Sequence, residues 1–385
     1  MHHCSLKLRF YPTITQEDIF SKEFGCARYV YNWALRYRTD KYAAGEKITY
    51  VQSSAALTNL KKELPWMKES SSVPQQQALR HLQEAFNNFF EKRAKYPKFK
   101  KKDGKQSATY MNTAFKIRNG KIIIAKAGVL DIVWSKKMPD NISSLTISKD
   151  RAGRYFVSVK YEEVKKKLPK TGKNVGIDLG INALATLSDG TSIPNPRYTS
   201  KYSSLLTRAQ RRLSRKANGS KRREKAKLRV AKIHAKIADS RLDHIRKATT
   251  KIVRDFDTIC IEDLSPRNMM KNHCLAKAIG DCSFFEFRRQ LEYKSLWYGK
   301  TVVTIDRWFP SSKRCHDCGY IIDSLPLDVR EWDCPECGVS HNRDENAAKN
   351  ILSVGLTDTA RGGTLKPRGT SVLQRKGQRN ANRTA

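Results

Sequence analysis

Residues 174–180 read Asn-Val-Gly-Ile-Asp-Leu-Gly, an apolar run that leads into Asp178. The run predicts a buried strand, and Ala183-Leu-Ala-Thr-Leu187, followed by Asp189-Gly190, predicts the next strand and its turn. A carboxylate at the end of a buried strand is costly to desolvate without a cation partner. The sequence therefore predicts a sheet whose edge carries an acid that needs a positive partner.

Two further acids lie at comparable places. Thr258-Ile-Cys-Ile261 predicts a second buried strand that leads into Glu262, and Asp344 opens a predicted helix that ends near Val354. Carboxylates brought together repel one another unless divalent ions lie between them, as in two-metal phosphodiester cleavage with ions about 4 Å apart. Mg²⁺ suits such oxygen ligands. Taken singly, each acid could also be a helix cap or a surface residue.

The order of the acids resembles that of RNase H-like nucleases such as RuvC. The segments that carry them are similar to the three RuvC motifs of the TnpB family, which bacterial and archaeal insertion sequences encode: Val175-Gly-Ile-Asp-Leu-Gly180, Ile261-Glu-Asp-Leu264 and Asn342-Arg-Asp-Glu-Asn-Ala-Ala-Lys-Asn-Ile351. Segments 7–12, 24–34, 85–90 and 96–101 also resemble that family, which is similar to the miniature type V CRISPR effectors. The resemblance covers nearly all of residues 5–355.

The resemblance implies that Asp178, Glu262 and Asp344 are catalytic and hold two Mg²⁺ ions, and that the protein cleaves DNA under the guidance of an RNA. Asp263 is expected to point away from Glu262, because side chains alternate along a strand. Some relatives have lost the acids and act as RNA-guided repressors. This chain retains all three acids.

The predicted fold is α+β and multidomain. Thr15 and Asp18 suggest a capping box for a first helix that runs to about Arg38, and Pro74 opens a helix with an apolar stripe of Leu79, Leu82, Phe86 and Phe90. Turn signals at 119–120 and 150–153 predict hairpins in a β region that suggests a barrel, which strand 5–10 could close.

These observations and the resemblance together predict five parts: a helical recognition domain (13–94), a discontinuous β-barrel wedge-like domain (1–12 and 95–168), a RuvC-like α/β nuclease domain (172–308 and 341–356), an inserted zinc ribbon (309–340) and a basic disordered tail (357–385).

Cys315, Cys318, Cys334 and Cys337 form two CxxC pairs separated by 15 residues, the spacing of a four-thiolate zinc ribbon. A closed shell leaves no open coordination position, so the predicted zinc is structural. Iron or an unmetallated redox pair is the alternative. His316 and His341 are expected to be bystanders, Trp332 either contacts nucleic acid or packs under the metal, and the other five cysteines are expected to be small buried or neutral residues.

The 75 Lys+Arg and 37 Asp+Glu residues leave a formal charge of +38, which favours a polyanionic partner. Residues 208–254 hold 18 basic and three acidic residues, on helices broken at 218–219. A seam of Ala238, Leu242, Ile245, Thr249 and Ile252 predicts one packed face, which leaves cationic faces for nucleic-acid phosphates. The predicted contacts are Arg211, Arg212, Arg215, Arg222, Arg223 and Arg229.

Gln76 and Gln77 match the glutamine pair with which the family reads a short motif beside its target, and a glutamine can bond bidentately to adenine. Arg28, Tyr29 and Trp33 mix phosphate-binding and stacking chemistry, although Tyr29 and Trp33 could equally be core residues.

The resemblance thus implies an RNA-guided, Mg²⁺-dependent DNA endonuclease that supports retention of its transposable element. The expected partners are a guide RNA and double-stranded DNA, with the protein monomeric in the RNA complex and cytoplasmic. No apolar run approaches the ~18 residues of a membrane span. The alternatives are a non-cleaving RNA-guided repressor and a transposase that acts directly on DNA ends.

Overall fold

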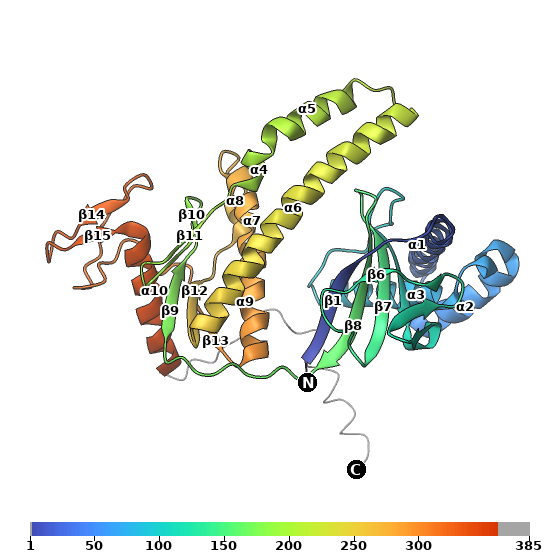
Figure 1. The fold of residues 1–385 in the computed structure, drawn as a ribbon, viewed down its shortest axis with the longest axis horizontal. Coiled ribbons are helices and arrows are strands. Elements are labelled where there is room, and N and C mark those ends of the chain that lie inside the picture. The colour runs from blue at the N-terminus through green and yellow to red at the C-terminus, as the bar shows by residue number, and fades with distance from the viewer. Residues whose placement is uncertain (1, 361–385) are drawn as a thin grey trace, which may run out of the picture. The chain divides into compact units, whose positions relative to one another are not determined.

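The computed structural model describes residues 2–360 and divides into two compact units, residues 1–164 and 165–385 (Figure 1). The first unit contains these elements in chain order: β1 (His2–Phe10), α1 (Ile14–Ala43), α2 (Tyr50–Glu63), η1 (Pro65–Glu69), α3 (Ser72–Phe90), β2 (Gln106–Met111), η2 (Asn112–Ala114), β3 (Phe115–Arg118), β4 (Lys121–Ile124), β5 (Gly128–Val129), β6 (Ile132–Val133), β7 (Ile142–Lys149) and β8 (Tyr155–Glu163).

The helices of the first unit share one apolar core. Val30 of α1, Leu57 of α2 and Leu82 of α3 are among its buried members. The capping box of α1 is formed by Thr13 and Gln16, two residues before the pair expected from the sequence. Phe90, expected on the buried stripe of α3, is 71% exposed because it lies at the last residue of the helix, beyond the core.

The strands of the first unit form two sheets. The larger sheet has the order β2-β7-β8-β1-β6, so the N-terminal strand lies between β8 and β6, and the smaller sheet has the order β3-β4-β5. Both predicted turns connect antiparallel strands, β3 with β4 and β7 with β8. Among the described residues, no pairing of β6 with β2 closes the larger sheet into the expected barrel.

The second unit is built on a five-stranded sheet. Its elements are β9 (Asn174–Asp178), β10 (Ala183–Leu187), β11 (Ser192–Pro194), α4 (Tyr198–Lys201), α5 (Ser203–Ser214), α6 (Lys221–Asp255), β12 (Thr258–Glu262), α7 (Pro266–Met269), α8 (Ala276–Cys282), α9 (Phe284–Tyr298), β13 (Thr301–Ile305), β14 (Glu331–Asp333), β15 (Ser340–Asn342) and α10 (Arg343–Ala360). Residues 357–360, assigned to the tail from sequence, belong to α10, and residues 361–385 lie outside the described part.

The sheet order is β11-β10-β9-β12-β13, with β9 and β10 antiparallel and β9, β12 and β13 parallel. Side chains alternate across the sheet. Val175 and Ile177 join the core that α6 and α9 cover, while Cys260 of β12 packs with Ile351 of α10 on the opposite face. Helices therefore cover both faces, and α10 is visible beside β9 in Figure 1.

Helix α6 has two buried segments, because it contacts different partners along its length. Ile233 and Ile237 pack against α5 through Ala209, whereas Ile245 and Ile252 join the core of the sheet. The predicted seam is correct from Ile245 onward and wrong at Ala238, which is exposed, while Leu242 is half-buried. A single periodic stripe cannot show that the partner of a helix changes halfway.

Candidate functional site

Asp178 and Glu262 lie at the same edge of the sheet. Each is the last residue of its strand, and the two strands are parallel neighbours in which Ile261 is opposite Ile177. Strict alternation places both acids on the face that α10 covers, because Gly176 and Cys260, two residues earlier, pack against that helix. Asp344 is in the first turn of α10. The fold therefore brings together the three acids that the sequence singled out.

Burial and mutual repulsion shift the pKa values of these carboxylates. Burial raises the pKa of Asp178 to about 7, and repulsion from Glu262 and Asp344 adds to the effect, against the opposing influence of Arg343 and Arg330. Burial also raises the pKa of Glu262, although a hydrogen bond from Ser311 opposes this. The arrangement favours positive charge between the acids.

The three acids offer carboxylate oxygens, which are ligands that suit hard divalent ions such as Mg²⁺. Within residues 2–360, the carboxylate oxygens of the triad do not all lie within 4.8 Å of one another.

Sequence reasoning missed two side chains that contact the acids. Ser311, on the segment after β13, donates its hydroxyl to Oε1 of Glu262. Arg330 donates from Nη1 to Oδ1 of Asp344 at 3.1 Å. Neither residue has a local sequence signal, because each reaches its acid only through the fold of the segment between β13 and α10.

Asp263 points away from Glu262, as the alternation predicted. It accepts hydrogen bonds from Arg288 of α9 and from Arg307 after β13. These two guanidinium groups lower its pKa despite partial burial. Asp263 therefore forms ion pairs with two arginines, which connect the end of β12 to α9 and to the segment after β13.

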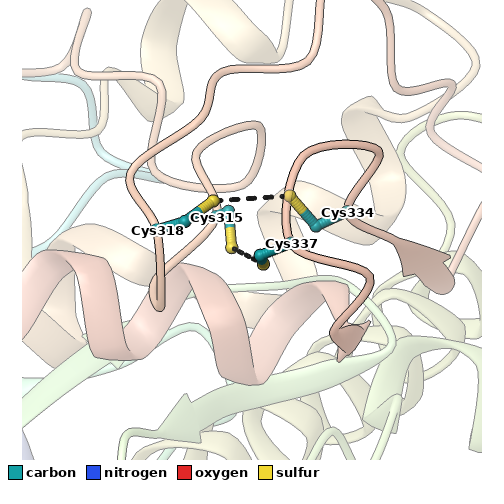
Figure 2. Close-up of side chains that lie close together, drawn as sticks. All are labelled: Cys315, Cys318, Cys334 and Cys337. Carbon is teal, nitrogen blue, oxygen red and sulfur yellow. Dashed lines mark hydrogen bonds between the residues drawn. The ribbon is translucent and has the colours of Figure 1, made fainter.

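The four predicted zinc ligands converge on one point (Figure 2). The Cys315 and Cys337 sulfurs are 3.6 Å apart, and those of Cys318 and Cys334 are 3.5 Å apart. A tetrahedral zinc with Zn–S bonds of about 2.3 Å separates its sulfurs by about 3.8 Å, so the cluster fits this ion. Gly319 and Gly338 have positive φ angles of 83° and 71°, which close each turn behind its cysteine pair.

One thiol of the cluster ionises more readily than its neighbours. Burial raises the pKa of Cys334, but backbone N–H groups of Cys337 and Glu336, together with the neighbouring thiols, lower it overall to about 7, whereas the pKa values of Cys318 and Cys337 are raised. Thiolates are the form that binds zinc. The four-cysteine cluster could therefore hold a metal ion with sulfur ligands.

His341 lies in contact with the cysteine cluster. Its Nε2 lies 3.0 Å from the Cys315 sulfur, and Cys315, Asp317 and His341 form a second group that could hold a metal. Trp332 is buried and packs against the His341 ring, with centroids 4.9 Å apart, so it belongs to the small core under the cysteines. Of the other five cysteines, Cys4, Cys26, Cys260 and Cys282 are buried and Cys274 is exposed.

The segment between β13 and α10 is fastened to the helix that carries Asp344. Asn346 donates to the Arg314 carbonyl at 2.7 Å and accepts from the His316 amide at 3.0 Å. Asn350 donates to the carbonyls of Ser311 and Arg314. The cysteine site therefore lies on a segment that is hydrogen-bonded to the first turns of α10.

The predicted nucleic-acid contacts separate into exposed and structural residues. Arg223 donates to the carbonyls of Leu213 and Lys216 at 3.0 and 2.8 Å, which ties α6 to the end of α5. The exposed members are Arg211, Arg212, Arg215, Arg222 and Arg229.

In α3, Gln76 is exposed and Gln77 is buried. Gln75, the residue before this pair, is also buried and donates to the Met67 carbonyl and the Ser70 hydroxyl. In α1, Tyr29 is 38% exposed and packs edge-on against Trp66, while Trp33 stacks on Tyr37 and lies against the helical core. Of the glutamine pair, only Gln76 is therefore open to a base.

No helix within residues 2–360 is long and apolar enough to cross a membrane.

Comparison with known proteins agrees with this geometry. A family model described as a probable transposase of the OrfB/IS605 type matches residues 156–273, a Cas12f1-like TNB domain model matches 284–351, and a helix-turn-helix domain model matches 1–47. A cryo-EM structure of a Cas12f1–sgRNA–target DNA complex has a TM-score of 0.57 at 14% identity, over 91% of this chain and 98% of that one, which shows the fold.

Two relatives match over nearly their whole length. A protein of Streptomyces pristinaespiralis is 50% identical over 94% of this chain and 92% of its own. InsQ of Escherichia coli K12 is 32% identical over 91% of this chain and 92% of its own. Both are named as candidate RNA-guided DNA endonucleases.

The second unit has a mixed α/β fold with three acids around one sheet edge, and the whole chain resembles the miniature effector Cas12f1 in fold. The full-length relatives make the assignment specific, because identity at this level shows the family. The chain belongs to the TnpB family of insertion-sequence proteins, the RNA-guided DNA endonucleases of the OrfB/IS605 type.

Proposed function

We propose that this protein is an RNA-guided DNA endonuclease that hydrolyses phosphodiester bonds with two Mg²⁺ ions at Asp178, Glu262 and Asp344. The observation that carries the proposal is the placement of all three acids around one sheet edge, on two parallel strands and one helix. Guidance by RNA rests on the full-length relatives that carry this name.

The three acids and the two side chains that contact them have different roles in the proposed reaction. Asp178, Glu262 and Asp344 would hold the ions, which when bound supply an activated water and stabilise the leaving oxygen. Ser311 fixes one oxygen of Glu262 through its hydroxyl, and Arg330 fixes one oxygen of Asp344. Both contacts limit the rotation of the carboxylates and so maintain the geometry that in-line displacement needs.

The remaining assignments follow from this function. Zinc at the four cysteines would be structural and would stabilise the segment that carries Arg330. The guide RNA would select the target by base pairing, with the exposed arginines of α5 and α6 on the phosphates and Gln76 at a short adjacent motif. We expect the protein to be monomeric with its RNA, to act in the cytoplasm where element and genome are present, and to favour retention of its element.

The test is to purify the protein with the RNA that accompanies it in cells that carry the element, and to add plasmids with and without the matching target. The proposal predicts linearisation of the matching plasmid only, and only with Mg²⁺. Binding of the matched plasmid without cleavage would indicate a guided repressor. Joining of element ends without RNA would indicate a transposase.

A further inference from the structure

A basic depression of about 470 Å³ opens on the first unit, remote in sequence from the acids, the cysteines and the arginines of α5 and α6. Its walls come from α3, from the segment after it, and from β2 and β7. The lining residues are His81, Lys100, Lys101, Gly104, Lys105, Ser107, Thr109 and Thr146. The lining therefore combines three lysines and three hydroxyls with an imidazole and contains no carboxylate.

The lysine-rich segment 95–105 is anchored rather than free. The Asn32 side chain of α1 donates to the Lys100 carbonyl at 2.9 Å and accepts from the Lys100 amide at 2.7 Å. The Lys100 ammonium lies 4.0 Å from the centre of the Tyr31 ring. An unstructured, solvated run of charges would not form these contacts, so the fold sets the position of Lys100.

The positive charges that line the depression repel one another. Desolvation lowers the pKa of Lys100, and repulsion from Lys105 adds to this. Desolvation, followed by the charge of Lys100, also lowers the pKa of His81. A ligand with several negative oxygens would relieve this repulsion, and the hydroxyls of Ser107 and Thr109 could donate to the same oxygens.

We propose that this depression is a phosphate subsite that binds the phosphodiester backbone of a nucleic-acid strand. The lining contains no Phe, Tyr or Trp on which a base could stack, so the site suits a backbone rather than a free nucleotide. Lysines act as point charges on phosphates and fix a strand without reading its sequence. The subsite rests on the proposed function, because its ligand would be the phosphate backbone of the same guide RNA or target DNA.

The test compares two variants with equal loss of charge. One is Lys100→Gln/Lys101→Gln/Lys105→Gln, and the control is Lys47→Gln/Lys136→Gln/Lys137→Gln, whose lysines are exposed on the same unit and outside the depression. The probes are the RNA sequenced from the wild-type preparation and transcribed in vitro, and a matched DNA duplex added to the RNA-loaded protein. Affinity is measured between 50 and 300 mM salt.

Each lost phosphate contact lowers the slope of log affinity against log salt by about 0.7 for a single strand or 0.9 for a duplex. We therefore expect the depression variant to lose about 2 in slope and roughly tenfold or more in affinity at 150 mM salt, and the control to change much less. A loss of affinity for the RNA identifies RNA as the strand bound in the depression. A loss of affinity only for the DNA duplex identifies DNA. Equal behaviour of both variants in both steps overturns the subsite.

Two arms keep the result interpretable. Lys101→Glu/Lys105→Glu leaves Lys100 and its contacts with α1 intact, so a similar loss in this variant cannot come from disturbed packing. Thermal unfolding of each variant checks the fold. If wild-type protein itself carries no RNA and binds none, the proposed function fails, which differs from a failure of the subsite alone.

Discussion

Gly176 of β9 and Ala348 of α10 are in backbone contact: a Cβ at position 176 would overlap the Ala348 carbonyl oxygen and lie 2.7 Å from the Leu352 amide nitrogen. Asp178 follows Gly176 by two residues, and Asp344 precedes Ala348 by one helical turn. The absence of a side chain at position 176 therefore sets how closely the helix that carries one acid approaches the strand that carries another.

The first prediction concerns this contact. Gly176→Ala is expected to lower the unfolding free energy by about 3 kcal/mol, because only movement of a backbone can relieve the overlap. Gly280→Ala is the matched control, since a Cβ at that position of α8 meets nothing within 4 Å. Calorimetric unfolding of the purified protein measures both, and equal melting of the two variants would show that α10 does not pack as described.

The second prediction separates two neighbouring arginines. Arg223→Gln removes the hydrogen bonds to Leu213 and Lys216 and is expected to destabilise the α5–α6 pair by about 1–2 kcal/mol. Arg222→Gln changes an exposed side chain and is expected to leave stability unchanged while it lowers the salt slope of RNA binding by about 0.7. Urea unfolding and filter binding on both variants distinguish the roles. A stability loss in Arg222→Gln alone would reverse the assignment.

The third prediction concerns the metal at the cysteines. We expect about one zinc per chain by atomic emission, and we expect Cys334→Ser to lose it. Cleavage should then fall while RNA binding remains, because the segment that holds Arg330 beside Asp344 loosens. Cys274→Ser, which changes an exposed cysteine outside the cluster, should retain zinc and activity. Full activity of a zinc-free Cys334→Ser protein would refute the structural role.

The fourth prediction is a pH effect on the first unit. Burial raises the pKa of Glu23 to about 7 from 4.5, against a hydrogen bond from the Ser71 amide and the charge of Lys126. Because the folded state favours the protonated acid, its contribution is complete below about pH 4.5 and is lost as the pH rises through 7. Glu23→Gln should therefore match wild type near pH 4.5 and exceed it at pH 8 by up to about 3 kcal/mol. Unfolding measured at both pH values checks the sign, and a variant that is less stable than wild type at pH 8 would contradict it.

The parts of the site that were predictable from the sequence have a local signal, either at the end of a regular element or in the spacing of a motif. Asp178 and Glu262 end apolar strands. The spacing of the two CxxC pairs is that of a metal-binding cluster, and the four cysteines do lie together. Ser311 and Arg330 were not predictable, because they reach Glu262 and Asp344 through tertiary contacts. Arg223 and Gln77 show the converse: the residue type suits nucleic acid, but one forms a hydrogen bond between helices and the other is buried.

In the fold, too, the elements with a local sequence signal were predictable and those set by distant contacts were not. Hairpins with local turn signals formed where expected, as β3 with β4 shows. The barrel did not follow from the strands alone, because closure depends on pairing between strands that are distant in sequence. The first half of the α6 seam was missed because Ile233 and Ile237 face α5 rather than the sheet.

The most direct measurement of the central claim compares Asp344→Asn with Glu345→Gln, two neighbours in the first turn of α10, of which Glu345 pairs with Lys349 at 2.9 Å. Each RNA-loaded protein is given a matched plasmid with Mg²⁺, and target binding is measured in parallel. We expect Asp344→Asn to bind the target like wild type and to cleave it at least 100-fold more slowly, which is the order expected when a transition-state stabilising group is lost. Glu345→Gln should cleave at the wild-type rate. Unimpaired cleavage by Asp344→Asn would contradict the assignment of the acids.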